Sequence, residues 1–239
     1  SLGFITQIGT GNYNESTAKL YTDLSLITAN EEIAMNAQDV FKNLCMGSLV
    51  ENSDILMVSP LTLKQSVLRY IDQEILMAKS GAPAELIFKI NSLNDTDIIK
   101  RLIAASDAGV KIKMIVRGIC CLNVEKTGKT RNIEISSIVG RYLEHSRIFI
   151  FANGGEEKYY IGSADWMPRN LDNRIEVAAP VYDKEIQADL KRIVCYGFRD
   201  TAKGRIVDGT GENREKEREE NSVPFRSQEK LYNEYKNTL

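Results

Sequence analysis

The residues best suited to carry chemistry lie between positions 143 and 170. This stretch holds His145, the single histidine of the chain, with Arg147 two positions later. A turn of small residues, which contains Ser163 and Asp165, follows at 162–165 (GSAD). An imidazole can attack phosphorus or carry a proton near neutral pH, and a guanidinium can offset phosphate charge through two parallel hydrogen bonds. These residue types predict a phosphate site, although a lone histidine beside a strand is more often structural.

Alternating patterns of strands and helices must position these groups. Short apolar runs and period-2 segments predict strands at residues 55–58, 86–90, 110–116, 133–136, 148–151, 159–161 and 175–181. Apolar residues at helical spacing predict helices at about 30–44, 63–79, 94–109 and 184–196. The strand–helix–strand–helix–strand series from residue 55 to 116 implies parallel strands joined by right-handed crossovers. We therefore predict an α/β sandwich around a mixed sheet.

The candidate residues can meet at one edge of this sheet. Ligands of such sheets bind beyond the carboxyl ends of the strands. Arg117 and Ser163 each follow a predicted strand, whereas His145 precedes its strand and reaches the same edge only if that strand runs antiparallel. Residues 9–12 (GTGN) have the same form as residues 162–165, a glycine, a hydroxyl, a small residue and Asn or Asp. Two such turns suggest two similar halves that face one site.

The composition limits the classes of function. A chain of 239 residues can form one large domain or two small ones, and its 43% hydrophobic content is ordinary for a soluble globular protein. A formal net charge of −2 argues against a general nucleic-acid-binding protein. The four cysteines form no CxxC pair and there is one histidine, so a zinc site is not expected. The chain also shows no apolar run long enough to span a bilayer.

Two sets of motifs resemble known families. His145-x-Arg147 followed by residues 162–165 resembles the second HxK…GSxN signature of the phospholipase D superfamily. A larger set of ordered segments resembles bacterial polyphosphate kinases of the long, histidine-phosphorylating type. These segments are residues 9–14 (GTGNYN), 17–18 (TA), 21–23 (YTD), 89–93 (KINSL), 115–120 (IVRGIC), 141–147 (RYLEHSR) and 163–167 (SADWM). The resemblance extends from about residue 3 to residue 208.

The second resemblance implies a domain organisation and a reaction. Residues 1–52 would be the C-terminal remnant of a first phospholipase D-like domain, 53–209 a second such domain, and 210–239 a charged linker and tail. The implied reaction is reversible transfer of the terminal phosphate of ATP to inorganic polyphosphate through a phosphohistidine. Its partners would be ATP or ADP, with Mg²⁺ bound to the nucleotide, and polyphosphate, without nucleic acid. A cytoplasmic location is expected; peripheral association with the inner membrane and a homo-oligomer stay open.

The resemblance also assigns residues. Arg117 and His145 are the expected catalytic residues, and with Tyr21 they would contact the nucleotide phosphates or the reacting histidine. The other expected phosphate-binding residues are Thr10, Asn12, Lys89, Asn91, Arg147, Ser163 and Asp165. Two of these residues have plainer alternatives, because Lys89 could be a solvated strand-end lysine and the Asp165 side chain could serve its turn rather than the ligand. No residue is predicted as a metal ligand.

The chain also departs from the family pattern. The family's phosphate-accepting histidine lies in an HxK motif before the turn at 9–12, and this chain begins after that point. We therefore expect the chain by itself to be inactive. Arg147 and Asp165 replace the Lys and Asn of the general phospholipase D pattern, which argues against a phosphodiesterase. Two alternatives remain: a phospholipase D-like phosphodiesterase completed by a symmetric dimer, and a non-catalytic module that binds polyphosphate or nucleotide.

Overall fold

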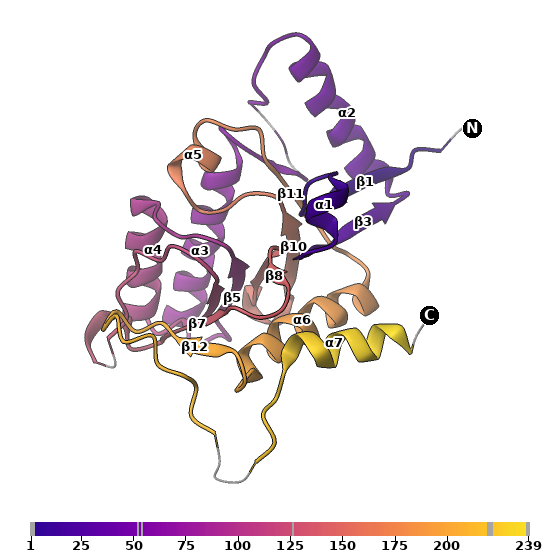
Figure 1. The fold of residues 1–239 in the computed structure, drawn as a ribbon. Helices are drawn as coiled ribbons and strands as arrows, with labels where there is room; N and C mark the ends of the chain where they lie inside the picture. Colours follow the sequence, from indigo (N-terminus) through magenta and orange to yellow (C-terminus); the bar gives the residue numbers. More distant parts are fainter. Residues whose placement is uncertain (1–2, 52, 54, 126, 219–221, 238–239) are drawn as a thin grey trace.

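A single mixed sheet forms the centre of the molecule (Figure 1). A computed structural model describes residues 3–51, 53, 55–125, 127–218 and 222–237. The strands of the sheet are β4 (Met57–Val58), β5 (Glu85–Ile90), β6 (Lys111–Val116), β7 (Ile133–Ile138), β9 (Arg147–Phe151), β10 (Lys158–Gly162), β11 (Val177–Pro180) and β12 (Gly204–Ile206). They are arranged in the order β12-β7-β6-β5-β9-β10-β11-β4. This arrangement confirms the predicted α/β class and mixed sheet.

Strand direction decides which residues share an edge. The central strands β5, β6 and β7 are parallel, as the predicted crossovers require. Strand β9 runs antiparallel to β5, with Lys89 opposite Ile148. The start of β9 therefore lies at the edge where β5 and β6 end, so His145 reaches the carboxyl edge of the parallel strands. His145 was expected to reach this edge only if its strand ran antiparallel, and β9 does run antiparallel to β5.

Helices cover both faces of the sheet (Figure 1). On one face lie α3 (Leu63–Lys79) and α4 (Thr96–Asp107), and on the other lies α6 (Lys184–Arg199). The carboxylate of Asp95 accepts from the first backbone N–H groups of α4, and Asp183 does the same for α6. Trp166 is fully buried against Phe88 and Phe149 at the centre of the first face. Helices α4 and α6 therefore begin at acidic N-caps, whereas α3 begins after Thr62 without a side-chain cap.

The N-terminal segment forms short strands outside the main sheet and packs against it. Strands β1 (Thr6–Gly9) and β3 (Ser25–Thr28) pair antiparallel, and the short helix α1 (Glu15–Ala18) lies between them in sequence. Strand β2 (Tyr21–Thr22) pairs in parallel with β8 (Leu143–Glu144), immediately before His145. Helix α2 (Glu31–Cys45), capped by Asn30, packs on the β4–β11 end of the sheet through Ile33 and Val40. The β2–β8 pair thus joins two segments that are far apart in the chain.

The C-terminal segment ends in a docked helix. Helix α7 (Ser227–Lys236) lies beside α6 (Figure 1), where the Tyr196 hydroxyl donates to Glu234 at 2.8 Å and the Tyr235 hydroxyl lies 3.0 Å from Asp189. The tail therefore ends in a helix that is docked on α6. Residues 1–2 and 219–221, the latter part of the charged linker, lie outside the described residues. The three-part domain division stays a prediction.

The strand boundaries differ from the sequence pattern in one informative place. A strand was predicted at residues 175–181, but the observed strand β11 is shorter and spans Val177–Pro180. Glu176 instead turns its carboxylate to the Ser163 hydroxyl and to Asn170. Two short 3-10 turns, Gly128–Thr130 and Asn153–Gly155, connect other elements. No helix in the described ranges is long and apolar enough to cross a membrane.

Candidate functional site

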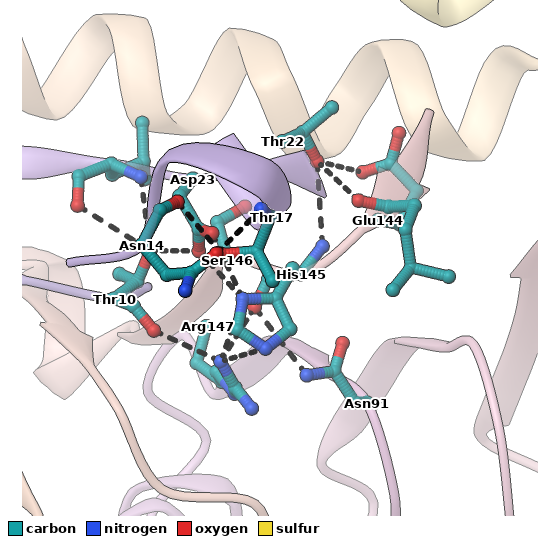
Figure 2. Close-up of polar contacts among 12 residues, drawn as sticks. Thr10, Asn14, Thr17, Thr22, Asp23, Asn91, Glu144, His145, Ser146 and Arg147 are labelled. Carbon is teal, nitrogen blue, oxygen red and sulfur yellow. Dashed lines mark hydrogen bonds and ion pairs between the residues drawn. The ribbon is translucent and has the colours of Figure 1, made fainter. Parts of the chain in front are cut away.

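His145 is held by a carboxylate from the N-terminal segment. Its Nδ1 lies 2.9 Å from both carboxylate oxygens of Asp23 (Figure 2). Since a carboxylate only accepts, Nδ1 carries the proton of this bond and Nε2 is left as the second functional nitrogen. The His145 side chain is 12% exposed, and the Tyr21 ring lies against it with centroids 4.9 Å apart. The lone histidine is therefore oriented rather than free to rotate.

The turn at residues 9–12 positions Asp23. The buried Thr10 hydroxyl donates to Asp23 Oδ1 at 2.7 Å and accepts from the backbone N–H of Leu24 at 2.9 Å. A Cβ at Gly11 would overlap the Asp23 carboxylate, so only glycine leaves room for it. Asn12 is exposed and lines a pocket of about 250 Å³ together with Tyr21 and Asp23. This arrangement gives Gly11 a steric role that the motif by itself does not reveal.

Arg147 connects the two similar turns. Its guanidinium forms a two-point ion pair with Asp165, through Nε at 3.3 Å and Nη2 at 3.0 Å. Nη1 donates to the Thr10 carbonyl at 3.0 Å and lies 3.2 Å from His145 Nε2. Because Arg147 is only 6% exposed, most of its donors serve the protein interior. Its charge lies beside His145, and the predicted meeting of the two turns takes place through this side chain.

Asn91 completes the connection beneath His145. Its backbone N–H donates to Asp165 Oδ1 at 2.7 Å. With the amide oriented to match its neighbours, Oδ1 accepts from Arg147 at 2.7 and 3.1 Å, and Nδ2 donates to the Glu144 carbonyl at 2.7 Å. Asp165 therefore binds Asn91 and Arg147, which both lie outside its own turn. Phosphate contacts of Asn91, Arg147 and Asp165 stay predictions.

Lys89 is buried and paired, not solvated. Its Nζ lies 3.0 Å from Glu144 Oε2 and donates to the Ser146 carbonyl at 3.0 Å and hydroxyl at 2.7 Å. The two charged side chains are only 3% and 10% exposed. All three ammonium protons have acceptors inside the protein, so the expectation of a solvated lysine is wrong. The prediction that Lys89 contacts phosphate stays untested.

The partners of the Glu144 carboxylate stabilise its ionised form. Burial by itself raises the pKa of Glu144, but the Lys89 ammonium and the donors of Gln228 and Thr22 outweigh burial and hold the pKa below its usual range. The Glu144 carbonyl, on the same residue, accepts from Arg117 Nε at 2.8 Å. Glu144 therefore links the buried lysine to the arginine at the sheet edge.

The Arg117 guanidinium has two terminal nitrogens that are available to a ligand. It directly follows β6, is half-buried, and its Nε is held by the Glu144 carbonyl. No residue in the described part of the chain accepts a hydrogen bond from its two terminal nitrogens. Those two donors form the planar fork that recognises phosphate or carboxylate oxygens. Among the predicted residues, Arg117 combines a fixed position with free donors.

Ser163 lies apart from this cluster. Its hydroxyl donates to Glu176 and accepts from the backbone N–H of Val177 at 3.2 Å. No bond among the described residues joins Ser163 to His145 or Arg147. Gly162 packs tightly against β11, where an added Cβ would lie 2.9 Å from the Ala178 Cβ. The turn at residues 162–165 packs against β11 at the edge of the sheet. Contact between Ser163 and phosphate stays a prediction.

The described residues offer no magnesium site of their own. No group of three His, Cys, Asp or Glu side chains among them could hold a metal ion. The nearby carboxylates are also engaged, since Asp23 binds His145, Asp165 binds Arg147 and Glu144 binds Lys89. Oxygen ligands for Mg²⁺ are thus already paired, and we derive no chemical step through a metal.

Sequence reasoning missed four residues of this site. Asp23 follows Tyr21 in the segment at 21–23, and Glu144 and Ser146 flank His145. Their adjacency to predicted residues was a usable signal for Asp23 and Glu144. No sequence signal pointed to Gln228, whose side chain binds Glu144 from 84 positions away.

Comparisons with known proteins agree over nearly the whole chain. Residues 2–49 match the family "Polyphosphate kinase C-terminal domain 1", and residues 56–228 match "Polyphosphate kinase C-terminal domain 2". The polyphosphate kinase of Vibrio parahaemolyticus is 46% identical over 230 residues, which cover 96% of this chain and 33% of that protein. The chain thus spans about a third of the length of the curated relatives it matches.

Solved structures show the same similarity. The crystal structure of polyphosphate kinase from Porphyromonas gingivalis superposes with a TM-score of 0.91 at 38% identity, over 99% of this chain and 36% of that one. A phospholipase D family member, Nuc from Salmonella typhimurium, aligns with 64% of this chain at 18% identity and a TM-score of 0.47.

Proposed function

The chain belongs to the polyphosphate kinase family, and we propose that its His145 and Arg117 form one half of a site for reversible transfer of the terminal phosphate of ATP to polyphosphate. The observation that carries this proposal is the pairing of an oriented imidazole with a free guanidinium fork. His145 is bound by Asp23, and Arg117 is held on the carbonyl of the residue just before His145. The proposal concerns the whole protein, of which this chain matches about a third by comparison with its relatives.

The proposed reaction proceeds in two transfers. First, a histidine nitrogen attacks the terminal phosphorus of ATP, so that a P–N bond forms and the P–O bond to ADP breaks. A terminal oxygen of polyphosphate then attacks the same phosphorus, which forms a P–O bond and breaks the P–N bond. We assign the phosphate-accepting histidine to a segment outside these 239 residues, because the family resemblance places it in an HxK motif before the turn at 9–12, whereas His145 follows that turn.

Arg117 and His145 have separate parts in this proposal. Phosphoryl transfer depends mainly on positioning and on stabilising charge at the phosphate oxygens. The two terminal nitrogens of Arg117 can each donate to a non-bridging oxygen. His145 Nε2 can exchange a proton with the attacking or leaving oxygen, and Asp23 then offsets the positive charge of the imidazolium. The Tyr21 ring contacts the imidazole in a tilted arrangement and helps to hold it in place.

Direct binding measurements test the proposal. We would titrate the chain with polyphosphate and, separately, with a non-hydrolysable ATP analogue and Mg²⁺. Arg117→Ala should weaken binding at least about tenfold, because a charge-assisted contact contributes about 1.5–3 kcal/mol. His145→Ala should weaken the same binding. The matched control is Arg101→Ala, which removes the same charge from α4, where Arg101 forms an exposed pair with Asp72 of α3.

The outcomes separate the alternatives. Equal losses for Arg101→Ala and Arg117→Ala would indicate only general attraction of a polyanion and would overturn the assignment. Hydrolysis of a bis-aryl phosphodiester by the chain, lost in His145→Ala, would favour a phosphodiesterase instead. Phosphorylation of the chain by ATP on His145 would overturn the assignment of the accepting histidine to another segment.

A further inference from the structure

The C-terminal helix contacts the site through one side chain. Gln228 lies in the first turn of α7, and its amide binds both backbone groups of Tyr142. The Tyr142 N–H donates to Oε1 at 3.0 Å, and Nε2 donates to the Tyr142 carbonyl at 2.8 Å. The second Nε2 proton goes to Glu144 Oε1 at 2.7 Å. The side chain therefore holds residues 142–144 as a neighbouring strand would hold them.

The contact reaches Arg117 and His145, the two residues of the proposed phosphate site. The Glu144 carboxylate receives Gln228 on one oxygen and Lys89 on the other, the latter at 3.0 Å. The Glu144 carbonyl fixes Arg117 Nε at 2.8 Å, and His145 is the next residue. A shift of residues 142–144 would therefore move Arg117 and His145 together.

The seat of Gln228 is shaped for this side chain. A Cβ at Gly140 would lie 2.5 Å from Gln228 Oε1 and 2.8 Å from its amide carbon. Real Cβ atoms do not approach other atoms so closely, so Gly140 leaves the space that the amide occupies. Gly140 and Gln228 thus give two independent ways to disturb the same contact.

Helix α7 is anchored without Gln228. The Asp200 carboxylate accepts from the Ser227 N–H at 2.8 Å and hydroxyl at 2.7 Å. At the other end of the helix, the Tyr235 hydroxyl lies 3.0 Å from both oxygens of Asp189. Loss of the Gln228 amide should therefore leave α7 docked, and its effect can be separated from loss of the helix.

We propose that Gln228 is a positioning residue for the phosphate site, which it acts on by clamping residues 142–144 beneath Arg117 and His145. The consequence for ligand binding rests on the function proposed above. The structural part, that Gln228 sets the position of His145, does not rest on it. Helix α7 is then part of the active-site framework, in addition to packing on α6.

His145 provides a direct probe, because it is the single histidine. Its imidazole gives one set of ¹H–¹³C and ¹⁵N resonances, free of overlap from other histidines. We would record these resonances for Gln228→Met, which keeps the length and packing of the side chain but loses the amide. Gly140→Ala disturbs the seat and leaves the amide in place. Tyr235→Phe is the matched control, since it removes a hydrogen bond from the far end of the same helix.

The expected result is a difference between the variants. Gln228→Met and Gly140→Ala should shift the His145 resonances and weaken binding of polyphosphate or the ATP analogue about three- to tenfold. Tyr235→Phe should do neither, even where its loss of thermal stability matches theirs. Gln228→Glu should bind more weakly than Gln228→Met, because its second carboxylate oxygen faces the Tyr142 carbonyl and Glu144.

Three outcomes would overturn the proposal. The first is unchanged His145 resonances in Gln228→Met, and the second is an equal shift in Tyr235→Phe. The third is a shifted resonance with unchanged affinity, which would show that the clamp does not serve ligand binding. If the unmodified chain bound neither polyphosphate nor nucleotide, the proposed function would fail, while the resonance comparison would still decide the position of His145.

Discussion

Replacement of the buried Lys89 gives the strongest test of its charge pairing with Glu144. In Lys89→Met an apolar side chain of similar length replaces the ammonium and leaves the Glu144 carboxylate buried at 10% exposure. Breaking a buried pair by removing one partner costs about 3–5 kcal/mol, because the remaining charge is uncompensated. For a chain of this size, that loss corresponds to a fall in melting temperature of about 6–20 °C.

The loss should depend on pH. In the unmodified chain the pKa of Glu144 is depressed, so its stabilising contribution is complete above the ordinary carboxyl pKa and is lost as the pH falls through the folded pKa. Without Lys89, burial dominates and the folded pKa should rise above the ordinary value. The variant then loses stability as the pH rises through that raised pKa. The difference in unfolding free energy between the two chains should therefore widen from pH 5 to pH 8.

Urea unfolding followed by circular dichroism at pH 5, 6.5 and 8 measures this difference. The control is Lys113→Met, which removes an exposed lysine 3.6 Å from Glu85 and should cost less than about 1 kcal/mol. Lys89→Met combined with Glu144→Gln should recover part of the loss, because no charge remains buried. A deficit below about 1 kcal/mol at pH 8, or one that is the same at all three values, would refute the reasoning.

Three further substitutions test individual contacts. Asp23→Asn should cost about 1.5–3 kcal/mol and change the tautomer of His145, seen in its ¹⁵N resonances; an unchanged tautomer would contradict the 2.9 Å contact. Arg147→Lys should cost about 1–3 kcal/mol in urea unfolding, since one ammonium cannot reproduce the two-point pair with Asp165; equal stability would argue against that pair. Gly162→Ala should cost about 1–3 kcal/mol, because its Cβ would lie 3.0 Å from a carbonyl oxygen of β11; an unaltered melting temperature would show that the sheet can yield there.

Much of the fold follows from local patterns. Apolar periodicity predicts the helices and most strands correctly, because burial of one face at a fixed spacing is a property of short segments. Acidic residues such as Asp95 and Asp183 mark helix starts for an equally local reason, since their side chains accept from N–H groups two or three positions later. The predicted start of β11 was two residues too early. The Glu176 carboxylate binds the side chains of Ser163 and Asn170, and the apolar pattern of a strand gives no sign of these contacts.

The amino-acid pattern alone predicted the α/β class, most of the helices and strands and the family, and it named candidate phosphate-binding residues around His145. Which of those residues keep donors available to a ligand follows from the packing of the whole chain. Lys89 and Arg147 have their donors satisfied inside the protein, whereas the terminal nitrogens of Arg117 find no acceptor in the described part of the chain. The partners that orient His145 and Glu144 come from 122 and 84 positions away. Hydrogen-bond saturation depends on which distant groups meet when the chain packs, and residue spacing carries no information about that.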